Sequence, residues 1–209
     1  MAEATNRVIV IDDDPSVREG LDGLLRSVGL QVSAYGSVSE FLDAKPVDGP
    51  ACLVLDVRLP GQGGLDFQRS LTEAGVHLPI IFITGHGDIP MSVRAMKDGA
   101  VEFMTKPFRE QDLLDAISAG LQRDRLHRER QKAIGQLQAR YDSLTQRERE
   151  VMKLVVSGQL NKQIAAAIGL SEITVKVHRG NVMRKMEAKS VAELVVIAQK
   201  LRSESTPPD

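Results

Sequence analysis

The sequence predicts an α/β fold for the first part of the chain and an all-α fold for the last part, joined by a helical linker. Five short apolar runs alternate with helical patterns before residue 121, as in a doubly wound five-stranded parallel sheet. From residue 142 onward every segment has helical spacing. We therefore expect one domain over 1–121, a linker over 122–141, a helical domain over 142–202 and a disordered tail over 203–209.

Each predicted strand is a short run rich in β-branched and other apolar residues. The strands are Arg7–Ile11, Gln31–Tyr35, Cys52–Leu55, Ile80–Thr84 and Val101–Thr105. Helices are predicted between them at Pro15–Val28, after a Ser37–Glu40 capping box, at Leu65–Ala74 and at Pro90–Asp98. In sheets of this kind, functional groups gather at the carboxyl ends of the strands.

The segment from Arg109 to Tyr141 contains no proline and favours a helix. Its first turns carry an apolar stripe that should pack on the sheet, formed by Leu113, Leu114, Ile117 and Leu121. The stripe breaks over residues 122–132 and resumes at Ile134. This break favours a solvated helical linker, and a dimerising coiled coil is the alternative.

Four helices are predicted after residue 142. They are Gln146–Val156 behind a Thr145–Glu148 capping box, Asn161–Ile168 ended by Gly169, Glu172–Met186 capped by Ser171, and a helix from Ser190 to Leu201. The two middle helices and the residues between them have the pattern of a helix, a tight turn and a second helix. The second helix of such a pair can enter the major groove of DNA.

Charge and composition narrow the range of functions that the chain can have. Residues 1–108 carry nine basic and fifteen acidic side chains, whereas residues 142–202 carry eleven basic and six acidic ones, so only the second part should face a polyanion. The sequence has no apolar run of about 18 residues and no signal-peptide pattern. We expect a cytoplasmic protein without membrane contact, whose single cysteine, Cys52, is buried and reduced.

Polar side chains stand at the ends of four predicted strands. Asp12 and Asp13 follow the first, Asp56 the third, and Lys106 the fifth, while Thr84 ends the fourth. Parallel strands bring these ends together, so the side chains should share one crevice. Three carboxylates without Cys or His favour Mg²⁺ or Mn²⁺ over zinc. A carboxylate beside such an ion and an ammonium group can attack a phosphoryl group.

Residues 5–121 resemble the receiver domain of two-component response regulators, which has a flavodoxin-like fold. The likeness rests on VIDDDPSVR (10–18), LVLDVRLPGQGGL (53–65), IFITGHGD (81–88) and FMTKPF (103–108). It implies that Asp56 accepts a phosphoryl group, and that Asp12, Asp13, Asp56 and the carbonyl of Arg58 bind Mg²⁺. It also implies that Thr84 and Lys106 contact the phosphoryl group, that Phe103 switches with Thr84, and that the Lys106–Pro107 peptide is cis.

Residues 144–201 resemble the LuxR-type helix-turn-helix of NarL/FixJ response regulators. The likeness rests on LTQREREVMKLVVSG (144–158), NKQIAAAIGLS (161–171) and TVKVHRGNVMRKM (174–186). The residues expected at DNA are Lys162, Thr174, Lys176, Val177, Arg179, Asn181 and Lys185. Gly180 stands where the family often has a bulkier or basic residue, which removes one expected contact.

The two resemblances together imply a phosphorylation-controlled transcription regulator. Its partners would be a sensor histidine kinase, double-stranded promoter DNA, a second copy of the chain after phosphorylation and, as a further candidate, RNA polymerase. It would catalyse only its own phosphotransfer and dephosphorylation. One alternative is a phosphatase of the haloacid dehalogenase type, in which the nucleophile follows the first strand. Another is a DNA-binding protein whose first domain only dimerises.

Overall fold

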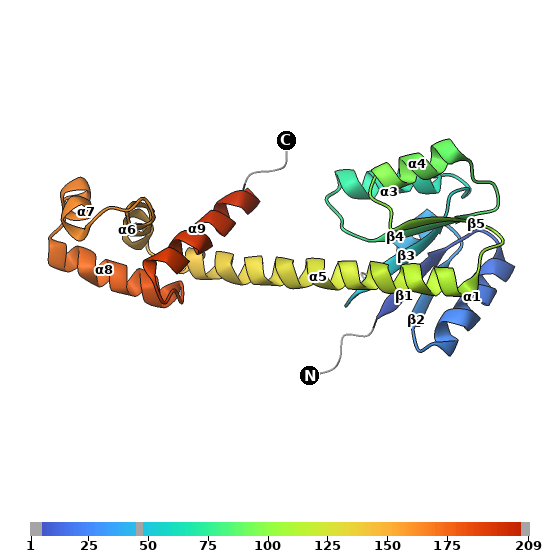
Figure 1. Ribbon diagram of the computed structural model, residues 1–209, viewed down its shortest axis with the longest axis horizontal. Coiled ribbons are helices and arrows are strands. Elements are labelled where there is room, and N and C mark those ends of the chain that lie inside the picture. The colour runs from blue at the N-terminus through green and yellow to red at the C-terminus, as the bar shows by residue number, and fades with distance from the viewer. Residues whose placement is uncertain (1–5, 45–47, 206–209) are drawn as a thin grey trace. The chain divides into compact units, whose positions relative to one another are not determined.

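The computed structural model describes residues 6–44 and 48–205. These residues belong to two compact units, which divide between Arg128 and Glu129. The first unit holds a sheet and its covering helices, and the second is helical (Figure 1). No helix among the described residues is long and apolar enough to cross a membrane.

The first unit contains a five-stranded parallel sheet in the order β2-β1-β3-β4-β5. The strands are β1 (Arg7–Ile11), β2 (Gln31–Tyr35), β3 (Ala51–Asp56), β4 (Ile80–Thr84) and β5 (Glu102–Thr105). The predicted doubly wound sheet is therefore confirmed. Strand β3 is one residue longer at each end than predicted, and β5 begins one residue later.

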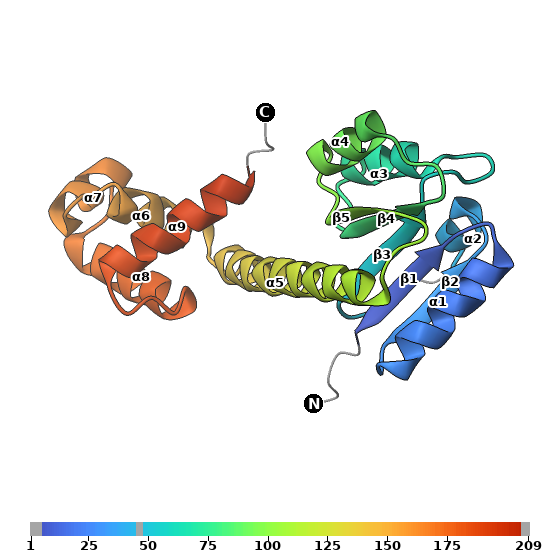
Figure 2. The same cartoon turned by 45° about the vertical axis from the view of Figure 1, so that its right-hand side comes forward.

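Helices cover both faces of this sheet. They are α1 (Pro15–Ser27), α2 (Val38–Leu42), α3 (Gly64–Glu73), α4 (Ile89–Lys97) and the first turns of α5 (Glu110–Asp142). Side chains of α2, α3 and α4 share one apolar core with the sheet, and those of α1 and α5 share another. Figure 2 shows α3 and α4 on one side of the strands and α1 and α5 on the other. All the strand residues of β3 are buried, as expected for a central parallel strand.

The capping box predicted at Ser37 forms only in part. The Ser37 hydroxyl accepts the N–H of Glu40, as a capping residue should. The Glu40 carboxylate, however, accepts the N–H of Gly36 at 2.6 Å, one residue before the position that a capping box requires. The helix start was therefore predicted correctly, but the reciprocal bond was not.

Helix α5 runs without interruption over 33 residues and contributes to both units. Its predicted stripe is confirmed, because Leu113, Ile117 and Leu121 are buried against the sheet. At its other end, Leu137 and Tyr141 pack on the core of the second unit. The exposed middle of the predicted linker is thus shorter than residues 122–141.

Close packing holds α5 against the sheet. Cys52 is fully buried and free, and a Cβ atom at Gly120 would lie 2.6 Å from its Sγ. The carboxylate of Asp124, also buried, accepts the N–H of Ala51 at 2.8 Å and that of Arg128 Nε at 2.6 Å. The helix therefore needs a glycine to approach β3 and uses an aspartate to bond the start of that strand.

The second unit consists of α6 (Gln146–Val156), α7 (Asn161–Ile168), α8 (Glu172–Lys185) and α9 (Val191–Ser205), with the end of α5. The capping box of Thr145 and Glu148 is confirmed in both directions. Gly169 ends α7 with φ 67°, a left-handed conformation that suits glycine. Helix α9 continues to Ser205, so residues 203–205 are helical where disorder was predicted; residues 206–209 lie outside the described residues.

Candidate functional site

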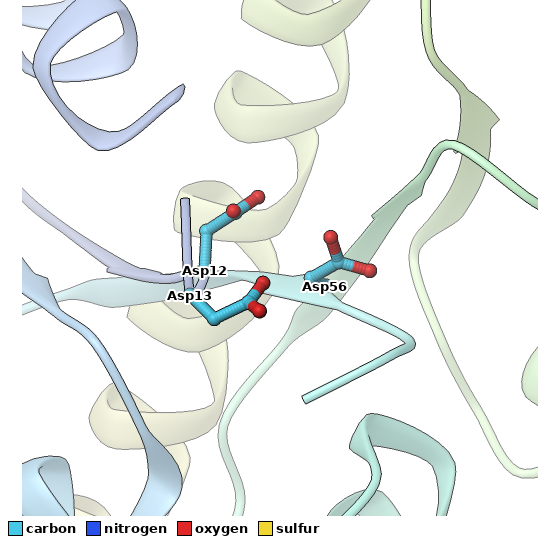
Figure 3. A group of neighbouring side chains, drawn as sticks. All are labelled: Asp12, Asp13 and Asp56. Atoms are coloured by element: carbon cyan, nitrogen blue, oxygen red, sulfur yellow. The ribbon is translucent and has the colours of Figure 1, made fainter. Parts of the chain in front are cut away.

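Three carboxylates meet at the carboxyl ends of β1 and β3. Asp12 and Asp13 follow β1, and Asp56 is the last residue of β3 (Figure 3). One oxygen from each lies within 4.8 Å of the others, with Asp12 and Asp56 buried and Asp13 exposed. The donors are all hard oxygen atoms and their charges repel one another, so the group fits a Mg²⁺-type cation. This acid cluster, Asp12, Asp13 and Asp56, is typical of a receiver Mg²⁺ site.

The ammonium group of Lys106 joins two of these acids. Its Nζ lies 2.6 Å from Asp12 Oδ2 and 3.1 Å from Asp56 Oδ2. Burial raises the pKa of the Asp12 carboxyl by more than this ammonium lowers it. For Lys106, burial alone would lower the pKa, but the hydrogen bonds that its ammonium donates to both carboxylates outweigh burial and raise it. Lys106 therefore stays charged inside the cluster, and the Lys106–Pro107 peptide is cis, as expected.

The loop after β3 holds Asp56 in place through its backbone. The N–H of Arg58 donates to Asp56 Oδ1 at 2.9 Å, and Lys106 binds the other oxygen. A Cβ atom at Gly64 would lie 2.3 Å from the carbonyl oxygen of Asp56. Helix α3 can begin this close to the nucleophile candidate only because residue 64 has no side chain.

Thr84 and Phe103 lie on the neighbouring strands β4 and β5. Thr84 is buried and its Oγ1 accepts the N–H of His86 at 3.3 Å. The Phe103 ring is partly buried, 6.1 Å from the ring of Phe82. A Cβ atom at Gly87 would lie 2.9 Å from Phe103 Cε1 and 3.1 Å from Thr84 Cγ2. Gly87 thus contacts both residues of the expected switch. Nothing in the sequence indicated this contact.

Asp14, the third acid of the run after β1, has a different role. Its side chain accepts the N–H of Ser16 at 2.8 Å and caps the N-terminus of α1. Its own N–H donates to Asp12 Oδ1 at 3.0 Å. Asp14 therefore serves as the N-terminal cap of α1 and is not a member of the acid cluster.

The outer face of α8 carries most of the side chains expected at DNA. Lys176 and Val177 are exposed, Thr174 and Asn181 are half-buried, and Lys162 is exposed on α7. Arg179 is also half-buried, and its guanidinium donates to Asn161 Oδ1 at 3.0 Å. The structure therefore presents Lys176 and Val177 more openly than Arg179.

Lys185 lies in a different environment from the other residues expected at DNA. Its ammonium is 2.6 Å from the buried carboxylate of Glu148 and 3.0 Å from the carbonyl of Ser143. Burial would raise the pKa of Glu148, but Lys185 and the N–H of Thr145 lower it overall. Lys185 thus links α8 to the start of α6 through an ion pair, and its expected contact with DNA stays a prediction.

Two family models match the chain in the two regions just described. The model for the response regulator receiver domain matches residues 8–118. The model for bacterial regulatory proteins of the luxR family matches residues 142–198. The chain belongs to the FixJ/NarL family of response regulators.

Individual relatives agree with this assignment. Nodulation protein W of Bradyrhizobium diazoefficiens is 55% identical over 194 residues, which cover 93% of this chain and 86% of the relative. Response regulator protein TodT of Pseudomonas putida is 48% identical over 202 residues, covering 97% and 89%. The solved structure of response regulator StyR has a TM-score of 0.85 and 50% identity, covering 94% of this chain and all of that one.

Family membership settles the broad function of this response regulator. It is a transcription regulator of a two-component system, with an acidic phosphorylation site and a DNA-binding LuxR-type helix-turn-helix. A receiver domain implies a histidine kinase as partner, and the helix-turn-helix implies DNA. The family is not one of conventional enzymes, so the haloacid dehalogenase-type alternative is wrong.

Proposed function

We propose that this response regulator is switched by transfer of a phosphoryl group from a sensor histidine kinase to Asp56. In this step an oxygen of the Asp56 carboxylate forms the new O–P bond, while the N–P bond of the kinase phosphohistidine breaks. The observation that carries the proposal is the position of Asp56. It ends a buried strand beside two further acids, with one oxygen bound by Lys106 and the other by the N–H of Arg58.

A Mg²⁺ or Mn²⁺ ion fits the same site. Its protein ligands would be Asp12, Asp13, Asp56 and the backbone carbonyl of Arg58, in keeping with the oxygen donors of the acid cluster. Such an ion, when bound, neutralises charge on the oxygens of the transferring group. The chain itself supplies Lys106, whose ammonium already bridges two carboxylates and can pair with a phosphoryl oxygen.

Thr84 and Phe103 would carry the signal away from Asp56. The Thr84 hydroxyl would bond a phosphoryl oxygen, and the Phe103 ring would move into the space that Thr84 leaves. Their common contact with Gly87 supports a coupled movement, because a shift of one changes the room for the other. Phosphorylation would in this way alter the surface of the receiver and promote a homodimer.

The receiver would occupy residues 1–121 and the DNA-binding domain residues 142–202, with the linker over 122–141. Two DNA-binding domains in a dimer would bind a two-fold promoter site in double-stranded DNA. The contact candidates are Lys162, Thr174, Lys176, Val177, Arg179, Asn181 and Lys185. RNA polymerase is a further candidate partner, and the family supports a cytoplasmic location.

Asp56→Asn tests the proposal. Promoter-DNA affinity of the full chain is measured with and without acetyl phosphate and Mg²⁺. We expect the phosphodonor to raise the affinity of the native chain and to leave that of Asp56→Asn unchanged, because an amide cannot accept the phosphoryl group.

Asp14→Asn is the matched control. It removes an acid from the same run, and Asn caps a helix about as well as Asp. This variant should keep the full response to the phosphodonor. Equal enhancement of the native chain and Asp56→Asn would exclude Asp56 as acceptor. If the phosphodonor transferred no phosphoryl group to the native chain or to either variant, the receiver would act only as a dimerisation module.

A further inference from the structure

The outer face of α8 has an apolar centre. Ile173 is 79% exposed and Val177 is 59% exposed, although both are large aliphatic side chains. They stand four residues apart, so they lie next to each other on one side of the helix. The opposite side holds Val175 and Val182, which are fully buried in the core of the second unit. Helix α8 therefore has an apolar inner face and a second, exposed apolar patch, formed by Ile173 and Val177.

Neither the stability of α8 nor its packing explains this patch. Isoleucine and valine are β-branched and have a lower helix propensity than alanine, lysine or glutamate, so they do not favour the helix at an exposed site. Gly180, one turn beyond Val177, extends the line with an open position, since no described atom outside the neighbouring backbone of α8 lies within 4 Å of the Cβ it lacks. The first two turns of the outer face thus carry exposed aliphatic groups, which favours contact with a partner molecule.

The charges around the patch indicate that this partner is duplex DNA. Lys176 is exposed beside Val177, and Arg184 is exposed along the same side of α8. Glu172, in the first turn, is an exposed acid nearby. Residues 142–202 carry eleven basic and six acidic side chains, so the surrounding surface favours a polyanion. An apolar patch among cations on the second helix of a helix-turn-helix fits the floor of the major groove.

Aliphatic side chains can recognise only one group in that groove. The edges of the base pairs present hydrogen-bond donors and acceptors, and thymine alone adds a C5-methyl group. Ile173 and Val177 have no donor or acceptor in their side chains. They are separated by about 6 Å along the helix axis, which is close to two base-pair steps of about 3.4 Å each.

We propose that Ile173 and Val177 read the methyl groups of thymines about two base pairs apart and so set the sequence preference of the second unit. The inference rests on the proposed binding of the helix-turn-helix to promoter DNA. Lys176 and the other cations would then supply affinity through phosphates, while the apolar patch supplies selectivity. Recognition at the centre of α8 would depend on a methyl group rather than on a hydrogen bond.

Replacement of thymine by deoxyuridine tests this directly, because it removes the methyl group and leaves the hydrogen-bonding edge unchanged. The full chain, treated with acetyl phosphate and Mg²⁺, selects its preferred sequence from a pool of random duplexes. Affinity is then measured for that duplex and for versions with deoxyuridine at one thymine at a time. We expect binding about fourfold weaker for each methyl group that loses its contact.

Ile173→Ala and Val177→Ala should each bind the thymine and deoxyuridine duplexes alike at the position that the missing side chain reads. Val196→Ala is the matched control, since Val196 is an exposed valine on α9 of the same unit. It should keep the native ratio of the two affinities at every position. Both α8 substitutions are at exposed sites, so the variants should fold.

The outcomes separate the two levels of the proposal. A chain that enriches no duplex contradicts the proposed promoter binding itself. A chain that binds its selected duplex tightly, but with equal affinity after every replacement by deoxyuridine, leaves DNA binding intact and overturns the reading of methyl groups. Equal weakening of thymine and deoxyuridine duplexes by Ile173→Ala would also contradict the inference, because the side chain would then act without regard to the methyl group.

Discussion

Two glycines let the backbone approach the acid cluster and the residues that would respond to it. Gly64 allows α3 to start against the carbonyl of Asp56, and Gly87 lies against Thr84 and Phe103. In both places an added methyl group would come within 3.0 Å of another atom. At Gly64 that atom belongs to the backbone, which cannot move without disturbing Asp56. At Gly87 it belongs to the Phe103 side chain, which can turn.

Gly87→Ala should therefore weaken the response to phosphorylation while leaving the chain folded. The new methyl group would push on Phe103 and Thr84, at a cost to the free energy of unfolding of about 1–3 kcal/mol, typical of overpacking. It would also bias the Phe103 rotamer before any phosphoryl group arrives. The measurement is the gain in promoter-DNA affinity when acetyl phosphate is added.

Gly85→Ala provides the comparison for that variant. Gly85 lies in the same loop, and no atom of the described chain lies within 4 Å of its missing Cβ. We expect Gly85→Ala to respond to the phosphodonor as the native chain does. If both alanine variants kept the full response, the contact of Gly87 with Phe103 would have no part in switching.

Sequence reasoning located the acid cluster because strand ends are visible in the pattern of apolar runs. Asp12, Asp56, Thr84 and Lys106 all follow or end predicted strands, and the parallel sheet brings them together. Gly64 and Gly87 were missed, since a glycine in a loop gives no sign of which atoms approach it. The ion pair of Lys185 was not predicted, because helical spacing does not reveal that Glu148, 37 residues away, reaches the same side of α8.

The contact between α5 and β3 depends on a small residue facing a thiol. Gly120 lies in the part of α5 that covers the sheet, and its missing Cβ would meet Cys52 Sγ. Glycine lowers helix propensity by about 1 kcal/mol relative to alanine. Its presence here is explained by the close approach of α5 to β3, and not by the helix itself.

Gly120→Ala should destabilise the first unit by about 1–3 kcal/mol, because the new methyl group overlaps the Cys52 sulfur. Adding Cys52→Ala should recover part of this loss, since it removes the sulfur atom that clashes. Urea unfolding followed by circular dichroism measures the free energy of unfolding for the two single variants and the double variant. Strictly additive effects of the two substitutions would contradict the proposed contact.

Gly135→Ala is the control in the same helix. No described neighbour lies within 4 Å of the Cβ that Gly135 lacks. The substitution should therefore raise the free energy of unfolding by about 0.5–1 kcal/mol, through helix propensity alone. A loss of stability in this variant would mean that position 135 has contacts of its own.

Most element boundaries followed from capping residues and apolar periodicity, and fell within one residue of the predicted ones. Asp14, Ser37, Thr145 and Ser171 each cap the helix that follows them. Where boundaries were missed, a local pattern gave no stop signal. The predicted end of helix α9 is Leu201. No glycine or proline interrupts the chain before Pro207, however, and the helix extends to Ser205.

The stability of the protein should depend on pH through a pair of histidines in the first unit. His77, in the loop before β4, stacks on His127 of α5 with ring centroids 3.8 Å apart and an angle of 23° between the planes. Burial, followed by the influence of His127, lowers the pKa of His77 below its ordinary value of 6.5; Asp124 opposes this shift, and Arg123 and Arg128 add to it. The folded chain therefore prefers neutral His77.

The free energy of unfolding should fall as pH drops below about 6.5. In that range the unfolded chain binds a proton at His77 while the folded chain does not. The contribution of His77 to the free energy of unfolding is therefore complete above pH 6.5, and it is lost as the pH falls toward the lower pKa that His77 has in the folded chain. His77→Phe keeps a ring for stacking but cannot titrate, and a cavity of about 130 Å³ beside His77 gives it room. Chemical unfolding at several pH values between 7 and 5 should show a shallower decline for this variant. Parallel curves for the variant and the native chain would count against His77 as the source.

Cys52 gives the molecule a built-in probe of its own opening. It is the single cysteine of the chain, its side chain is fully buried, and burial raises the pKa of its thiol to about 12. Only a thiolate reacts readily with alkylating reagents, so the closed first unit is protected twice, by access and by ionisation. The rate of labelling then reports how often the sheet and α5 part. Any signal that loosens the receiver can be followed by this reaction in the full-length protein, without adding a dye or a tryptophan.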